Sequence, residues 1–288
     1  LESVSSGKHV APKSEIMQAN SRVISKGHYL SSAAIGVLAT VGKVEVKVCQ
    51  RPTVGILVTG DELVEVHQKP KPGQIRNSNG YVLYHQVREC GAVPELFGIA
   101  PDDLNKLRNK IQQGLKKDVL LISGGVSMGD LDLVDDVFEQ LGVKIFYNKV
   151  DIKPGKPTVF GRKDNTLIFG LPGNPVSAST VFEIFVKPAI RKMMGFHQYH
   201  NMKLKAVLEK KITSRTKRQY FPPAWTYFEN NTFFTTPLPS KGSADVLAFA
   251  NSNSYLNIPG EVDEIKKGQG VEVLLRDEFW PTCLNKKA

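Results

Sequence analysis

The sequence has 288 residues, 41% of them hydrophobic and 23% charged, which is ample for the core of one large or two ordinary globular domains. With 38 Lys and Arg residues against 28 Asp and Glu residues, its formal net charge is +10. Such a charge favours an anionic partner, but the sequence contains no nucleic-acid recognition motif and no apolar run of about 18 residues. The charge alone does not choose among nucleic acid, an anionic membrane surface and a phosphorylated small molecule, but the lack of a recognition motif argues against a nucleic-acid binder and the lack of an apolar run against a membrane span.

The three cysteines, Cys49, Cys90 and Cys283, are scattered along the chain and form no Cys-x-x-Cys or Cys/His pattern of a zinc site. An odd, unclustered set of this kind predicts free thiols in a reducing compartment, and hence a cytoplasmic protein. The first residues lack the layout of a signal peptide, and no methionine precedes Leu1. We therefore expect the chain to be part of a longer protein.

Residues 1–48 show one helical pattern, at 31–42, and we expect them to be the remnant of an N-terminal or linker domain. From residue 49 to residue 197, short β-rich runs alternate with helical periods. They predict strands at 53–59, 93–99 and 118–125, helices at 79–90, 102–115 and 130–141, and a last helix that begins after Asn174 and is kinked or split at Pro188. This alternation predicts a doubly wound α/β layer with a mostly parallel sheet.

The pattern changes in residues 198–288. Period-two alternation at 202–212 and short β runs separated by Gly, Pro and Asn turns replace the helical periods. We expect a small all-β, barrel-like C-terminal domain here.

Carboxylates follow two of the predicted strands. In a doubly wound sheet, ligands bind where the carboxyl ends of strands run into helix N-termini. The segment TGDEL (59–63) places Asp61 and Glu62 after the first strand, although such a pair also fits an ordinary helix cap. Asp130 and Asp132 lie at the start of a later helix, where they can hold Mg²⁺ or cap the helix.

A glycine-rich segment, SGGVSMGDLD (123–132), follows the third predicted strand. Its adjacent glycines, Gly124 and Gly125, let backbone N–H groups approach a phosphate, and Ser123 and Ser127 add hydroxyl donors. A glycine-rich turn between a strand and a helix therefore favours phosphate binding.

Two further loops open helices. In GLPGNPVS (170–177), prolines on both sides of Gly173 stiffen the chain before a helix whose free N–H groups attract anions. In GQIRNSNG (73–80), Ser78 and Asn79 supply donors at the start of another helix. Both loops are predicted to contact an anionic ligand.

The segment VDIKPGKPTVFG (150–161) carries two lysines between prolines. Alone, it fits a solvated surface turn equally well. Next to the other loops, the prolines restrict Lys153 and Lys156, and fixed ammonium groups of this kind suit a tetrahedral oxyanion.

In this order and spacing, TGDEL, GxIRxSN, SGGVSMG, KPGKP and GLPGNPVSA resemble the molybdopterin molybdenumtransferase family, which includes bacterial MoeA and the E domains of its plant counterpart and of gephyrin. The resemblance covers nearly all of the chain. It implies a molybdopterin-binding layer like that of MoaB and MogA, and insertion of molybdate into adenylylated molybdopterin with Mg²⁺-dependent release of AMP. It also implies a homodimer of the complete protein, and an adenylyltransferase domain or partner that supplies the substrate.

Transferred to the matching positions, the resemblance implies three groups of site residues. The molybdate pocket would consist of Lys153, Lys156, Ser177, Arg218 and Ser243. The carboxylates that hold Mg²⁺ and serve hydrolysis would be Glu62, Asp102 and Asp132. The pterin phosphate and the nucleotide would lie against Ser78, Asn79, Ser123, Gly124, Gly125, Ser127, Pro172, Gly173 and Asn174.

The sequence departs from the family pattern in three ways. Asn77 stands where the family usually has aspartate, and Pro223 stands where a second arginine often follows Arg218. The N-terminal helical portion and the inserted all-β domain of the family have no counterpart in the sequence. In the family, that inserted domain closes the active site of the partner subunit.

Two other functions fit parts of the sequence. A molybdopterin adenylyltransferase shares the α/β layer, but it is a single domain without the trailing β domain or the KPGKP loop. A gephyrin-like scaffold would instead bind receptor loops near its C-terminal domain. Aromatic residues that could serve this role, but that more often belong to a core, are Phe221, Tyr227, Phe233 and Phe234.

Overall fold

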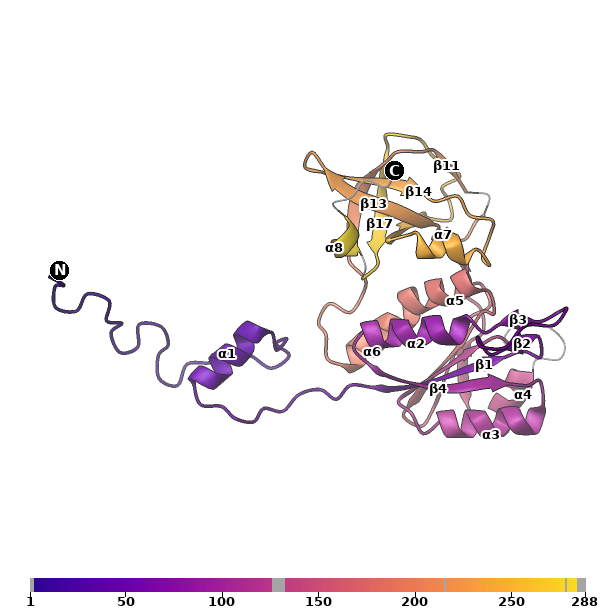
Figure 1. Ribbon diagram of the computed structural model, residues 1–288, viewed down its shortest axis with the longest axis horizontal. Coiled ribbons are helices and arrows are strands. Elements are labelled where there is room, and N and C mark those ends of the chain that lie inside the picture. The colour runs from indigo at the N-terminus through magenta and orange to yellow at the C-terminus, as the bar shows by residue number, and fades with distance from the viewer. Residues whose placement is uncertain (1–2, 126–132, 215, 278, 284–288) are drawn as a thin grey trace.

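The computed structural model describes residues 3–125, 133–214, 216–277 and 279–283, and of residues 280 and 281 the backbone only. An α/β layer and a barrel form the body of the molecule, while the N-terminal segment with α1 (Ser32–Thr40) extends away from both (Figure 1). Among the described residues, no helix is both long and apolar enough to cross a membrane. The three cysteines are free thiols, as predicted.

The sheet of the α/β layer has the strand order β4-β1-β5-β9-β8-β6. The first four strands run parallel, and β8 and β6 are antiparallel to their neighbours. Because helices cover both faces, β1 and β5 consist almost entirely of buried residues. The strands are β1 (Thr53–Thr59), β4 (Val93–Ala100), β5 (Val119–Ser123), β6 (Lys144–Tyr147), β8 (Val159–Lys163) and β9 (Thr166–Leu171). The predicted mostly parallel, doubly wound layer is confirmed.

Two sets of helices cover this sheet (Figure 1). The face toward the barrel carries α2 (Asn79–Glu89), α5 (Pro175–Val181), the π-helix η1 (Phe182–Val186) and α6 (Lys187–Met193). The other face carries α3 (Leu104–Gly114) and α4 (Leu133–Gln140), and each set has its own apolar core. The break predicted at Pro188 is confirmed. Proline has no backbone N–H to donate, and the regular α-helix is interrupted just before it by the π-helical turn η1.

The C-terminal domain is a closed barrel in the order β10-β14-β13-β15-β17. All its neighbouring strands are antiparallel except β10 and β14. Its strands are β10 (Lys203–Leu208), β13 (Pro223–Glu229), β14 (Thr232–Pro237), β15 (Ser254–Asn257) and β17 (Gly270–Leu275), with the short helices α7 (Val246–Ala250) and α8 (Phe279–Thr282) beside them. The predicted all-β domain is confirmed, while the boundaries at residues 48 and 197 stay a prediction.

Short strand pairs and an apolar interface join the two parts. Strand β7 (Ile152–Lys153) pairs in parallel with β12 (Gln219–Tyr220). The segment 150–161 that carries Lys153 and Lys156, here called the lysine loop, is therefore hydrogen-bonded to the C-terminal part of the chain. Buried Phe221 and Tyr255 pack into the core formed by α2, α5 and α6. The remaining short pairs are β2 (Leu63–Val64) with β3 (Ile75–Arg76) and β11 (Ile212–Thr213) with β16 (Glu264–Ile265).

Candidate functional site

Three acidic residues, Asp61, Glu62 and Asp102, lie at the carboxyl ends of β1 and β4. These neighbouring parallel strands end at the same edge of the sheet, and the N–H of Asp102 donates to Oδ1 of Asp61 over 3.0 Å. Gly60 has φ of +142°, and the Glu62 carboxylate lies so close to it that an added Cβ would be 2.5 Å from Oε2. The structure thus brings together two of the predicted carboxylates, Glu62 and Asp102, and adds Asp61.

This carboxylate group lacks a compensating cation. None of the ion pairs found among the described residues involves Asp61, Glu62 or Asp102. Partial burial raises the pKa of the Asp102 carboxyl above its ordinary value, and the charges of Asp61 and Glu62 raise it further. The edge of the sheet therefore carries concentrated negative charge that a bound cation would stabilise.

The glycine-rich turn after β5 packs directly on the end of β1. Gly124 and Gly125 have φ of +91° and +62°, in the left-handed region that favours glycine. A Cβ on Gly124 would overlap the carbonyl oxygen of Thr59, and one on Gly125 would lie 2.6 Å from the Thr59 hydroxyl. A side chain at Gly124 would require movement of β1 or of the turn, and the N–H of Gly124 donates to the carbonyl oxygen of Leu171 over 3.2 Å, so the turn is held against both β1 and β9.

Asn79 connects three loops of the predicted site. Its side chain is buried at the start of α2, and Nδ2 donates to Oγ of Ser123 over 2.9 Å and to the carbonyl oxygen of Gly173 over 2.7 Å. The Ser123 hydroxyl in turn donates to the carbonyl oxygen of Pro172. The predicted cofactor-binding residues at 78–79, 123–125 and 172–174 therefore lie in neighbouring loops, with Asn79 at their centre.

Replacing Asn79 by alanine should loosen this junction. We expect Asn79→Ala to lower the free energy of unfolding by about 1–3 kcal/mol, because the buried Ser123 hydroxyl and Gly173 carbonyl lose their common donor. Ser78→Ala is the matched control, since Ser78 is exposed and its side chain makes no capping hydrogen bond. Urea unfolding of both variants measures the difference, and an equal loss in both would contradict the central role of Asn79.

The lysine loop is held from both sides. Gly155 has φ of +114°, and an added Cβ would lie 2.6 Å from Cγ2 of Val181, so the loop packs tightly on α5. On the other side, the N–H of Phe221 donates to the Lys153 carbonyl over 2.8 Å, and Nζ of Lys153 lies 5.2 Å from the centre of the Tyr220 ring. The half-buried Lys153 and exposed Lys156 thus project from a fixed backbone.

The C-terminal part of the chain brings Arg218 to this loop and Ser243 to the start of α5. Nη1 of Arg218 donates to the carbonyl oxygen of Ile152 over 3.1 Å, one residue before Lys153. Ser243 accepts a 2.9 Å hydrogen bond from Nδ2 of Asn174, and its carbonyl oxygen accepts from the N–H of Val176. Ser243 therefore lies at the N-terminus of α5, in whose first turn the predicted ligand Ser177 is buried.

Two predicted residues, Ser127 and Asp132, lie outside the described residues. Over the described ranges, the structure contains no group of three or more His, Cys, Asp or Glu side chains arranged to hold a metal ion. The complete predicted Mg²⁺ set of Glu62, Asp102 and Asp132 therefore stays a prediction.

Three residues with a part in the site were missed from the sequence. The Thr59 hydroxyl is buried beside Gly125 and has no hydrogen-bond partner among the described residues; its place before GDEL was the available signal. Tyr220 flanks Lys153, and its position two residues after Arg218 gave no hint of this contact. Asn77 was noted only as a lost carboxylate, but its buried Oδ1 accepts from the N–H of Gly80 over 2.9 Å and so caps α2.

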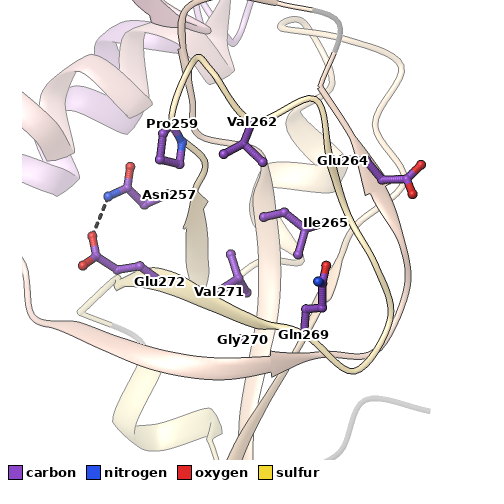
Figure 2. Close-up of a pocket in the computed structure, with 9 residues that line it drawn as sticks. All are labelled: Asn257, Pro259, Val262, Glu264, Ile265, Gln269, Gly270, Val271 and Glu272. Carbon is purple, nitrogen blue, oxygen red and sulfur yellow. Dashed lines mark hydrogen bonds between the residues drawn. The ribbon is translucent and has the colours of Figure 1, made fainter.

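The barrel has pockets of its own, away from these loops. One of about 660 Å³ lies between β15, β16 and β17, and its Glu272 accepts a hydrogen bond from Asn257 (Figure 2). The aromatic residues considered for a scaffold role do not form an exposed patch: Phe221 and Tyr227 are buried, and Phe233 and Phe234 are half-buried against other rings. Their assignment as core residues is the one that the structure supports.

The fold and the candidate site define an α/β protein with a C-terminal barrel, in which loops at one edge of the sheet lie beside residues from the C-terminal part of the chain. The family described as "Probable molybdopterin binding domain" matches residues 55–192, and the "MoeA C-terminal region (domain IV)" matches residues 205–275. The chain therefore contains a molybdopterin-binding domain followed by a C-terminal region of the MoeA type.

Individual relatives agree with this assignment. The molybdopterin molybdenumtransferase of Bacillus subtilis is 34% identical over 280 residues, which are 96% of this chain and 65% of the relative, and that of Staphylococcus epidermidis is 31% identical. The crystal structure of the molybdopterin biosynthesis MoeA protein from Pyrococcus horikoshii superposes with a TM-score of 0.75 at 33% identity, over 88% of this chain and 61% of that one. The chain thus spans slightly less than two thirds of the length of these relatives.

Proposed function

We propose that this protein inserts molybdate into adenylylated molybdopterin during molybdenum cofactor biosynthesis, with release of AMP. The proposal depends on the contacts between the two parts of the chain. Arg218 is hydrogen-bonded to the lysine loop, and Ser243 is hydrogen-bonded to Asn174 at the start of α5. Molybdate is a tetrahedral dianion, and the group formed by Lys153, Lys156, Arg218 and the two serines offers charged and hydroxyl donors that suit it.

The neighbouring loops supply the place for the organic substrate. The glycine-rich turn at Gly124 and Gly125, the start of α2 and the start of α5 all lie at the carboxyl edge of the sheet, where phosphate groups bind in this class of fold. Asn174 belongs to both groups, because its side chain contacts Ser243 while the neighbouring Gly173 is held by Asn79. A substrate that carries a phosphate and receives molybdate would span these two adjacent groups.

The carboxylates fit a resident Mg²⁺ ion. Mg²⁺ is commonly held by one or two carboxylates together with substrate phosphates, so Glu62 and Asp102 with Asp132 are an adequate protein contribution. When bound, the ion would neutralise charge that develops during cleavage of the phosphate–phosphate bond. The backbone N–H of Asp102 donates to Asp61, which positions Asp102. Burial raises the pKa of the Asp102 carboxyl, the charges of Asp61 and Glu62 raise it further, and this repulsion favours occupation by a cation.

The raised pKa of Asp102 gives a test of this cation site. The pKa of this carboxyl is higher in the folded than in the unfolded protein. The folded protein therefore loses stability as the pH rises from the unfolded-state pKa through the folded-state pKa. At pH 7 in EDTA, Asp102→Asn is therefore expected to increase the free energy of unfolding, by less than about 1 kcal/mol because the group is near solvent. Added Mg²⁺ should raise the Tm of the wild type and not that of the variant.

The matched control for this experiment is Asp164→Asn, at the turn between β8 and β9. It should respond to Mg²⁺ like the wild type. If Mg²⁺ stabilised Asp102→Asn as strongly as the wild type, Asp102 would not be a ligand.

The C-terminal barrel favours this function over an adenylyltransferase, which has no such domain. Receptor scaffolding receives no support from the aromatic residues, since none of the four considered forms an exposed patch. We infer a homodimer for the complete protein and an adenylyltransferase that delivers its substrate. Sedimentation equilibrium of the complete protein tests the dimer.

The reaction itself is tested by incubating the complete protein with adenylylated molybdopterin, Mg²⁺ and molybdate. AMP release that depends on molybdate, together with a product that activates a molybdenum enzyme lacking its cofactor, is expected. Absence of both in a correctly folded protein would refute the proposed reaction.

A further inference from the structure

An ion cluster lies where the barrel meets the helices, and it consists of the buried residues Glu183 and Lys187, the partly exposed Arg191 and the exposed Asp277. Lys187 on α6 is 1% exposed, and its Nζ lies 2.9 Å from Oε2 of Glu183 and 2.8 Å from Oδ2 of Asp277. Nη2 of Arg191 lies 3.1 Å from the other oxygen of Asp277. Lys187 and Arg191 on α6 therefore contact the two carboxylate oxygens of Asp277, which follows the last barrel strand.

This cluster contacts the chain segments that lead into the first barrel strand and out of the last one. Asp277 stands two residues after the last barrel strand, β17. Asn201 stands two residues before the first, β10, and its Nδ2 donates to Oε2 of Glu183 over 2.9 Å. The N–H of Leu275 donates to the carbonyl oxygen of Met202, which keeps the two ends side by side. One helical turn, Glu183 to Lys187, thus anchors the entry and the exit of the barrel.

The same turn is linked to both helices that begin at the candidate site. Oε1 of Glu183 accepts from Nε2 of Gln86 over 3.1 Å, and Gln86 lies two turns after Asn79 on α2. Glu183 and Lys187 continue the helix that starts at Asn174. The helices α2 and α5–η1–α6 therefore run from the site at their N-termini to the ion cluster near their other ends.

Stability alone does not account for such a cluster. A buried ion pair gains little net free energy, because the desolvation of both charges offsets their attraction, and well-packed apolar residues are often at least as stable. What charges add is a fixed geometry between their elements. Here the elements are the two parts of the chain that contribute the proposed molybdate ligands.

We propose that Lys187, Glu183 and Asp277 are positioning residues, which set the orientation of the barrel and thereby align Arg218 and Ser243 with Lys153 and Lys156. The proposal rests on the proposed function, since it assumes that these four residues bind one anion. None of the positioning residues contacts that anion. They can therefore change the affinity for the anion only by changing the positions of Arg218 and Ser243.

A double-mutant cycle in the complete protein tests this route. Asp277→Asn keeps the size of the side chain and leaves the Lys187–Glu183 pair in place. It should raise the Kd for molybdate three- to tenfold in calorimetry, and by less than 1.5-fold when Arg218 and Ser243 are both alanine. Arg191→Met, which removes a partly exposed partner of Asp277, should act in the same direction more weakly. Equal effects of Asp277→Asn in both backgrounds would overturn the proposal.

A second measurement does not depend on molybdate. Spin labels at Gln112→Cys on α3 and Lys205→Cys on β10, with Cys49→Ser to remove the exposed thiol, report the distance between the two parts. Asp277→Asn should broaden this distance distribution, whereas the control Lys211→Met, which breaks an exposed ion pair beside the β11–β16 strand pair, should not. An unchanged distribution with Asp277→Asn would overturn the positioning role. Broadening without molybdate binding by the wild type would refute the proposed function alone.

Discussion

Lys153→Ala and Lys156→Ala are each expected to weaken molybdate binding at least tenfold, the largest functional effect that the structure predicts. Both lysines project from a backbone held by α5 and by Phe221, so little reorganisation accompanies binding of the anion. Loss of one charge-assisted contact of about 1.4 kcal/mol corresponds to a factor of ten in Kd. Isothermal titration calorimetry with molybdate measures this directly.

The control for these variants is Lys149→Ala. This variant removes an exposed positive charge four residues before Lys153, at a position outside the KPGKP loop. If binding followed only the overall positive charge of the region, all three alanine variants would lose a similar, salt-dependent amount of affinity. An unchanged Kd in Lys153→Ala would remove this residue from the proposed pocket.

Gly124→Ala is expected to have the largest effect on stability among the loop substitutions, about 2–4 kcal/mol. A left-handed φ alone costs roughly 1–3 kcal/mol for a residue with a side chain, and the new methyl group would also overlap the Thr59 carbonyl. Relief of that overlap requires movement of β1 or of the glycine-rich turn. Chemical denaturation of the variant gives the change in the free energy of unfolding.

Gly73→Ala separates the two causes. Gly73 has a similar φ of +84°, but an added Cβ would meet no atom within 4 Å. We expect this variant to lose only the conformational part, about 1 kcal/mol. Equal losses for Gly73→Ala and Gly124→Ala would show that the close approach of the turn to β1 is unimportant.

The order of the elements and the place of the site were predictable from the sequence. Buried runs such as 53–59 and 118–125 could only be interior strands of a layered fold, and parallel strands bring their following loops to one edge. For this reason Asp61, Ser123 and Gly173 were expected near one another, and the structure places each with a partner from another loop. Local signals and topology were sufficient here.

Contacts between the two parts of the chain could not be predicted in this way. The Lys187–Asp277 ion pair joins residues 90 positions apart, and neither position is unusual in its local sequence. A hint was present in the charged i,i+4 pair Glu183 and Lys187 inside an otherwise apolar helix, since charges there require a buried partner. The identity of that partner depends on how the barrel packs, which local patterns do not encode.

Asn77 shows how one position can be assigned from a motif and still be misread. Against the family pattern it was a missing carboxylate, but in the structure its amide oxygen caps α2 through the N–H of Gly80. Asparagine and aspartate serve equally well as helix caps. The substitution therefore preserves the start of the helix on which Asn79 is placed.

The central claim is that one molybdate ion binds between the lysine loop and the C-terminal residues Arg218 and Ser243. The most direct measurement is anomalous X-ray scattering at the molybdenum edge from crystals of the complete protein soaked in molybdate. A single anomalous peak within contact distance of Lys153, Lys156 and Arg218, absent in Lys153→Ala crystals, is the expected result. A peak elsewhere in the molecule, with none at this junction, would contradict the account.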